Sequence, residues 1–287
     1  MYEIGYMQGR LSEIIDNKIQ AFPIKSWINE IVEGSKNNLF HIEWTLDHQG
    51  IEDNPFMTKE GQNKIKSLCQ IHNVNILSVT GDCFMQAPIW KLGKIYETNL
   101  TNEFLAVINA CNKLDVGIVV VPCVDFSSIQ NSQEEEKFLN FCKKYYQKIK
   151  EAGVRVAIES DYEPKRLNQF IRKLPNDVFG INYDIGNSAS LGFSHKQEID
   201  LYGDIIFNVH VKDRPLHGST VPLGEGNANF KEVFQSLFLA EYKGNFILQT
   251  ARAKQNNHLD VLLEYKNYTA FFIDKYLQKR PPKNLND

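Results

Sequence analysis

The sequence predicts a single-domain α/β protein of the (β/α)8 TIM barrel class, and three features of the chain support this prediction. Short β-branched runs alternate with longer amphipathic segments eight times along the 287 residues. The short runs are apolar throughout, as the strands of a parallel sheet covered on its faces require. The length also suits one closed barrel, which commonly takes about 250 residues, better than two average domains.

Eight apolar runs are expected to form the strands. In chain order these are Tyr2–Met7, Leu39–Trp44, Asn75–Thr80, Gly117–Val121, Val154–Glu159, Phe179–Asp184, Ile205–Val211 and Asn245–Gln249.

The segments between the runs place apolar residues at helical spacing. Two of them end in a glycine directly before a strand, at Gly153 and Gly244, as helix C-termini often do. We therefore expect a barrel over residues 1–278 and a C-terminal tail over residues 279–287. The expected helices are Lys25–Lys36, Thr58–His72, Glu97–Leu114, Gln133–Ala152, Pro164–Leu174, Lys196–Tyr202, Asn229–Glu241 and His258–Leu277.

Eight β/α units can also form an open, doubly wound sheet. That fold is expected to carry a glycine-rich phosphate turn after an early strand. Here the first strand is followed by Gln8-Gly9-Arg10, which does not fit the GxGxxG pattern. The closed barrel is therefore favoured.

Composition and charge narrow the choice of partners and compartment. The net charge of −3 disfavours a general electrostatic grip on nucleic acid. No run approaches the about 18 apolar residues that a membrane span needs, and the first residues do not resemble a secretory signal. The five cysteines are an odd number without a CxxC pair, which is typical of reduced thiols and favours a cytoplasmic location.

The strand ends carry the chemistry, because the active site of a barrel forms at the C-terminal ends of its strands. Strands five, six and seven finish with Glu159, Asp184 and His210, and strand eight finishes with Gln249. Burying two carboxylates side by side is costly unless a cation or a proton compensates them. Two carboxylates, one imidazole and one amide oxygen suit a single divalent ion, namely Mn²⁺, Zn²⁺, Co²⁺ or Mg²⁺.

Other polar residues near the strand ends are candidates for catalysis and for substrate binding. Glu43, at the end of strand two, is expected to transfer protons or to accept a substrate hydroxyl, with a structural role as the alternative. Basic residues beyond strands seven and eight suit a phosphate group, although solvated or paired side chains would give the same pattern. The expected substrate-binding residues are Asn187, Lys212, Asp213, Glu225 and Arg252.

At these residues the chain resembles a known family. The segments that show the resemblance are 182–188 (NYDIGNS), 209–213 (VHVKD), 221–226 (VPLGEG) and 242–246 (YKGNF), together with Phe230. They resemble the sugar-phosphate isomerase/epimerase group of the xylose-isomerase-like TIM barrel superfamily. The closest pattern is that of L-ribulose-5-phosphate or L-xylulose-5-phosphate 3-epimerases. The dense match covers roughly residues 154–252.

The resemblance implies a metal-dependent isomerase or epimerase that removes a proton next to the carbonyl of a ketose-type substrate. It implies that Glu159, Asp184 and His210 bind the metal and that Glu159 is also one of two acid/base groups. The substrate would be a small-molecule sugar or sugar phosphate, and the resemblance allows a homo-oligomer. Family epimerases have a second glutamate at the end of strand eight, where this chain has Gln249.

Gln249 leaves the reaction open, since its amide oxygen can bind a metal but cannot take a proton. Another group, such as Glu43 or Asp82, would then complete an isomerase or epimerase. The alternatives are a different reaction, such as a one-base proton shuttle or a dehydration, and an inactive sugar-binding barrel. Endonuclease IV-type nucleases belong to the same superfamily, but they carry a histidine where this chain has Asn187, so this function is disfavoured.

Overall fold

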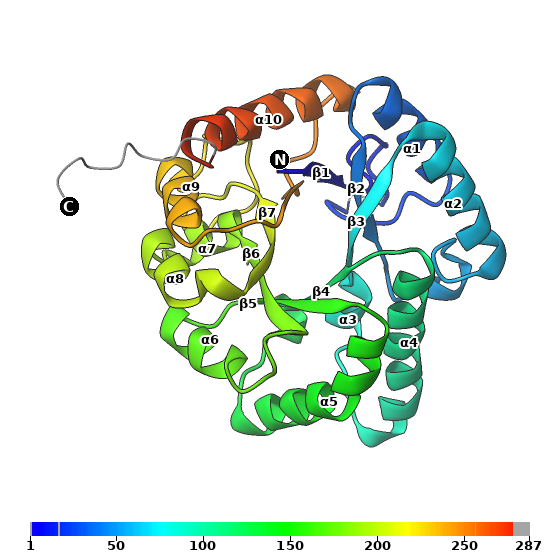
Figure 1. Ribbon diagram of the computed structural model, residues 1–287, viewed down its shortest axis with the longest axis vertical. Helices are drawn as coiled ribbons and strands as arrows, with labels where there is room; N and C mark the ends of the chain where they lie inside the picture. Colours follow the sequence, from blue (N-terminus) through cyan, green and yellow to red (C-terminus); the bar gives the residue numbers. More distant parts are fainter. Residues whose placement is uncertain (1, 17, 256, 278–287) are drawn as a thin grey trace.

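The computed structural model describes residues 2–277, apart from residues 17 and 256. Eight parallel strands form a closed barrel in the order β1 to β8, and helices surround it (Figure 1). The barrel closes where β1 pairs with β8, with Tyr6 opposite Leu248. The predicted fold class is therefore confirmed. The predicted tail at residues 279–287 lies outside the described residues.

Each of the eight predicted runs contains a strand, and β3 and β6 have the predicted bounds. No boundary moves by more than two residues: β1 and β2 start two residues later than predicted, and β4 ends two residues later. The strands are β1 Ile4–Met7, β2 His41–Thr45, β3 Asn75–Thr80, β4 Ile118–Cys123, β5 Arg155–Ser160, β6 Phe179–Asp184, β7 Ile206–Val211 and β8 Asn245–Leu248.

The eight predicted helices are present, and the described residues form two further short α-helices just after β3 and β6. These two are α3 Asp82–Gln86 and α7 Ile185–Leu191. The side chain of Asp184 caps α7 by accepting the backbone N–H of Asn187 at 2.8 Å. The other helices are α1 Trp27–Lys36, α2 Lys59–His72, α4 Lys94–Lys113, α5 Ser132–Glu151, α6 Pro164–Ile171, α8 His195–Tyr202, α9 Phe230–Leu239 and α10 His258–Phe272, which continues as a π turn over Ile273–Leu277.

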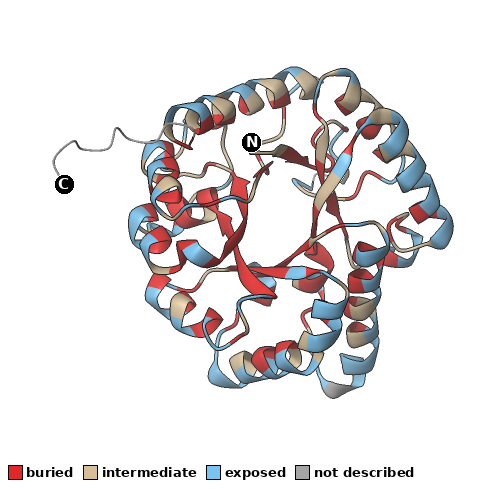
Figure 2. Cartoon of the chain, in the orientation of Figure 1, coloured by how far each residue is buried: buried red, intermediate tan, exposed pale blue. Residues whose placement is uncertain are grey.

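Most strand residues are buried, and the outer faces of the helices are exposed (Figure 2). All five cysteines are free thiols. Within the described part of the chain, no helix has both the length and the apolar character needed to cross a membrane.

A layer of polar side chains crosses the interior of the barrel below its C-terminal mouth. Glu43 of β2 accepts hydrogen bonds from Ser78 of β3 at 2.5 Å and from Asn208 of β7 at 3.0 Å. Asn208 also donates to the side-chain oxygen of Asn182 of β6 at 2.9 Å. Buried polar groups need such partners, and this layer supports the residues directly above it.

Candidate metal centre

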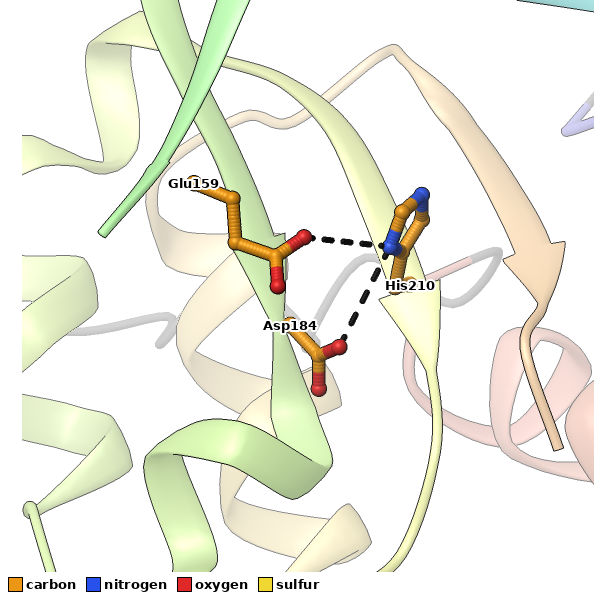
Figure 3. A group of neighbouring side chains, drawn as sticks. All are labelled: Glu159, Asp184 and His210. Carbon is orange, nitrogen blue, oxygen red and sulfur yellow. Dashed lines mark ion pairs between the residues drawn. The ribbon is translucent and has the colours of Figure 1, made fainter. Parts of the chain in front are cut away.

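Three predicted ligands come together at the mouth of the barrel. Glu159 lies near the end of β5, and the register of β6 with β7 places Asp184 directly beside His210. One ligand atom from each residue lies within 4.8 Å of the other two (Figure 3). Nδ1 of His210 is 3.4 Å from Oε2 of Glu159 and 4.0 Å from Oδ2 of Asp184. All three side chains are buried.

The opposite edge of the His210 ring is fixed by Glu43. Nε2 of His210 lies 2.8 Å from Oε1 of Glu43, and both side chains are fully buried. An Nε2–H that donates to this carboxylate leaves the lone pair of Nδ1 directed at Glu159 and Asp184. Metal-binding histidines usually have such a carboxylate partner, so the donor set fits a divalent ion.

The charges around His210 act strongly on its protonation. Burial lowers the pKa of His210, but Glu43 and Glu159 outweigh burial and raise the pKa to about 10. In the metal-free protein a proton on His210 therefore compensates the carboxylates, as either a cation or a proton must at such a site.

Lys212 also contacts the cluster. Its Nζ lies 3.2 Å from Oδ2 of Asp184 and 3.1 Å from Oε1 of Gln249. Burial raises the pKa of Asp184, while the Lys212 ammonium opposes this rise. A metal bound by Asp184 and Gln249 would compete with Lys212 for the same two oxygens.

Two asparagines hold the Glu159 carboxylate. Asn187 donates to Oε1 and Asn182 donates to Oε2, each at 2.7 Å. Arg214 in turn donates to the side-chain oxygen of Asn187 at 2.7 Å. Burial raises the pKa of Glu159, but the charges of His210 and Lys212 outweigh burial. The pKa of Glu159 therefore lies below its usual value.

Glu43, the predicted proton-transfer or hydroxyl-accepting residue, lies in the interior of the barrel below the mouth. Its carboxylate is fully buried and is occupied by Ser78, Asn208 and His210. Glu43 therefore reaches the cluster only through the His210 ring.

Asp213, a predicted substrate-binding residue, holds the backbone of the loop that follows β7. The side chain is fully buried and accepts the backbone N–H groups of Gly224, Gly226 and Ala228 at 2.8, 3.0 and 3.1 Å. These bonds order the loop between β7 and α9. Gly226 permits them, because a Cβ there would lie 2.1 Å from Oδ1 of Asp213.

Arg252 and Glu225 lie beside a separate cleft of about 800 Å³. The loops after β1, β7 and β8 and part of α10 form this cleft. Arg252 donates to the backbone oxygens of Gly9 and Ser12, and Glu225 is exposed. Neither side chain has a bond to the three clustered ligands within the described residues.

Asn182, Asn208 and Ser78 are not among the site residues predicted from the sequence, although the sequence contains a signal for the two asparagines. Asn182 and Asn208 lie two residues before Asp184 and His210, so they share the inner face of the same strands. A polar residue at that spacing inside an apolar strand indicates a polar interior layer.

The comparison with protein families decides the family. Residues 40–265 match the family described as the xylose isomerase-like TIM barrel. The chain belongs to this family. The resemblance inferred from the strand-end motifs is thereby confirmed.

Two relatives of this xylose isomerase-like barrel match parts of its sequence. The L-ribulose-5-phosphate 3-epimerase UlaE of Escherichia coli O157:H7 (strain EC4115 / EHEC) is 28% identical over 145 residues, which are 47% of this chain and 51% of UlaE. SgbU of Escherichia coli (strain K12) is 33% identical over 91 residues, 29% of this chain and 32% of SgbU. The matches span about a third to a half of these relatives.

Solved structures share the fold over nearly the whole chain. A D-tagatose 3-epimerase-like protein superimposes with a TM-score of 0.73 at 16% identity, covering 95% of this chain and 99% of that one. The IOLI protein with a bound zinc atom gives a TM-score of 0.75 at 14% identity, covering 96% and 100%. Sugar epimerases are therefore among the proteins that this barrel resembles.

Proposed function

We propose that this barrel is a metal-dependent isomerase or epimerase that acts on a ketose-type sugar or sugar phosphate. The observation that carries the proposal is the buried cluster of Glu159, Asp184 and His210, with Nδ1 of His210 facing both carboxylates. The family membership and the epimerase among the partial relatives support the same reaction class.

Glu159, Asp184 and His210 would hold one divalent ion, with Gln249 as a fourth ligand. When bound, an Mn²⁺, Zn²⁺, Co²⁺ or Mg²⁺ ion polarises the substrate carbonyl and stabilises the charge that develops as the neighbouring C–H is deprotonated. Glu159 takes this proton, since its lowered pKa keeps it ionised and Asn182 and Asn187 orient it.

The remaining residues have supporting roles in this proposal. Glu43 is a positioning residue that sets the His210 ring. Lys212 and Asn187 each donate a hydrogen bond to a carboxylate of the cluster and would contact the substrate there. Arg252 and Glu225 border the adjoining cleft and would contact a more distant part of a small-molecule sugar. The free thiols agree with a cytoplasmic location.

Metal content and proton exchange test the proposal. Elemental analysis of the purified protein should find about one divalent ion per chain, and D2O should exchange into the carbon beside the carbonyl of a ketose or ketose phosphate. Asp184→Asn and His210→Ala should each lose most of the metal, whereas Asp204→Asn, an exposed control, should keep it. If the protein contains no metal and exchanges no deuterium into any sugar of a broad panel, the proposed enzymatic function is refuted.

A sugar-binding barrel without turnover is the second candidate. It is favoured by one observation, namely that Gln249 stands at the end of β8 and cannot take a proton. Calorimetric binding of a sugar by protein that catalyses no exchange would support this candidate over the enzyme.

A further inference from the structure

A second carboxylate, that of Asp82, lies at the mouth of the barrel on the side of β3. Ser78 points into the barrel, because its hydroxyl donates to Glu43, and side chains alternate along a strand. Thr80 therefore points the same way, and its hydroxyl lies 3.4 Å from Oδ1 of Asp82. Asp82 thus sits directly above the inner face of β3.

This carboxylate is buried without a counter-ion. Its side chain is 7% exposed, and no cation of the described residues lies within ion-pair distance of it. The Arg10 guanidinium attracts Asp82 electrostatically, but the two side chains form no ion pair. The long contact with Thr80 is weak, so neither a cation nor a strong hydrogen-bond network compensates this charge.

Other carboxylates surround Asp82 electrostatically. Burial raises the pKa of Asp82 to about 7, and the carboxylates of Asp47, Glu159 and Glu43 raise it as well. Glu43 belongs to β2, Asp47 lies in the loop after β2, and Glu159 belongs to β5. Because the parallel strands β3 and β5 end at the same mouth, Asp82 lies at the same end of the barrel as Glu159 and the metal cluster.

The wall between Glu159 and Asp82 is apolar. Strand β4 lies between β3 and β5, with Val120 paired to Thr80 and Pro122 paired to Glu159. These side chains offer no proton-transfer group. Asp82 is thus the proton-carrying side chain on the β3 side of a space that has Glu159 on the β5 side.

We propose that Asp82 is the second proton-transfer residue of this barrel, the role that Gln249 at the end of β8 cannot fill. This inference rests on the proposed function. It names the group that completes the epimerisation.

The step balances without an added oxidant or reductant. Glu159 takes the proton from the carbon beside the carbonyl, and the electron pair of the broken C–H bond forms the enediolate. Protonated Asp82 gives its proton to the opposite face of that carbon, a new C–H bond forms and the carbonyl is restored. Exchange with water then deprotonates Glu159 and protonates Asp82 for the next turnover.

Asp82→Asn tests this role, with Asp125→Asn as the matched control. Asp125 follows β4, is exposed, and has a positive φ of 51° that asparagine also tolerates. In metal-loaded protein, Asp82→Asn should slow the interconversion of two epimers by about 100-fold or more, as loss of a general acid or base does. Metal content should stay unchanged in both variants, and Asp125→Asn should keep full activity.

Proton exchange separates this role from a role in binding. Starting from the epimer deprotonated by Glu159, Asp82→Asn should still exchange deuterium from D2O, and starting from the other epimer it should not. Equal interconversion in Asp82→Asn and Asp125→Asn would overturn the inference, and so would loss of exchange from both epimers with metal retained. An unmodified protein that shows no exchange refutes the proposed function, and the inference falls with it.

Thermal unfolding of the metal-free protein provides a readout that does not depend on activity. A raised folded-state pKa makes ionised Asp82 destabilising at high pH. The unfolding temperature of Asp82→Asn should therefore rise relative to unmodified protein between pH 5 and pH 8, while that of Asp125→Asn should not. A difference that does not change with pH would mean that Asp82 has a compensating partner, and would overturn the inference.

Discussion

Nε2 of His210 lies 2.8 Å from Oε1 of Glu43, and this contact joins β7 to β2 across the interior of the barrel. Both side chains are fully buried, so water does not compete for the bond. The Glu43 carboxylate thereby determines which ring nitrogen of His210 faces the other ligands.

Glu43→Gln should weaken divalent metal binding by about 10-fold to 100-fold, as loss of a carboxylate behind a ligating histidine typically does. Titration with Mn²⁺ or Zn²⁺ measures the affinity, and ¹⁵N NMR of labelled histidine reports the tautomer of His210. Glu136→Gln makes the same chemical change at an exposed position of α5 and should alter neither the metal affinity nor the tautomer of His210. Unchanged affinity and an unchanged tautomer in Glu43→Gln would contradict the positioning role.

Gln249→Glu should tighten metal binding by about tenfold, which corresponds to about 1.4 kcal/mol. The reason is that the substitution places an anionic oxygen where Lys212 now contacts the Gln249 amide oxygen. Calorimetric metal titration measures the change, and Gln133→Glu, on the exposed start of α5, is the control. Weaker binding in Gln249→Glu would show that residue 249 does not bind the metal.

Asp213→Ala should destabilise the protein by about 3 kcal/mol, since it leaves three backbone N–H groups without their charged acceptor. Urea unfolding measures the loss. Limited proteolysis should find new cleavage within residues 214–228, where the loop has lost its anchor. Asp204→Ala, which removes an exposed ion pair with Arg172, should cost less than about 1 kcal/mol. If residues 214–228 resist proteolysis in Asp213→Ala as they do in the unmodified protein, the Asp213 side chain does not hold this loop in place.

Glu198→Gln should change how stability depends on pH. Burial raises the pKa of Glu198 to about 7 from its ordinary 4.5, although hydroxyl groups of Ser188, Tyr183 and Tyr202 lower it in part. Because the pKa of Glu198 is higher in the folded state than in the unfolded state, its contribution to folding stability is fully present below about pH 4.5. It is lost as the pH rises through 7.

Relative to Glu198→Gln, the unmodified protein should therefore lose about 3 kcal/mol between pH 4.5 and pH 8. Urea unfolding at several pH values measures this difference. Glu136→Gln, with its exposed side chain, should run parallel to the unmodified protein. Parallel curves for Glu198→Gln as well would show that Glu198 ionises normally in the folded state.

The eight strands and the fold class were predictable because their signals are local. An apolar run of five or six residues and a helical segment with a glycine at its end can be recognised without knowing what they contact. The two short helices were missed for the same reason. The helix α7 depends on Asp184 turning one oxygen onto the N–H of Asn187, and a strand-end aspartate does not by itself reveal this contact.

The family and the three candidate ligands were also accessible from sequence. Glu159, Asp184 and His210 each end or nearly end an apolar strand, and parallel strands bring such ends to one mouth. Strand order alone then places β5, β6 and β7 side by side. Their proximity in the structure agrees with that reasoning.

The sequence by itself therefore determined the barrel, its family and which residues stand at the strand ends, since spacing and local composition encode these. Only the tertiary structure decided what each side chain contacts. It directed Glu43 to His210, Asp213 to the loop beyond β7, and Lys212 to Asp184 and Gln249. The physical reason is barrel closure: it joins residues as far apart as 43 and 210, and burial then requires each polar group to find a partner.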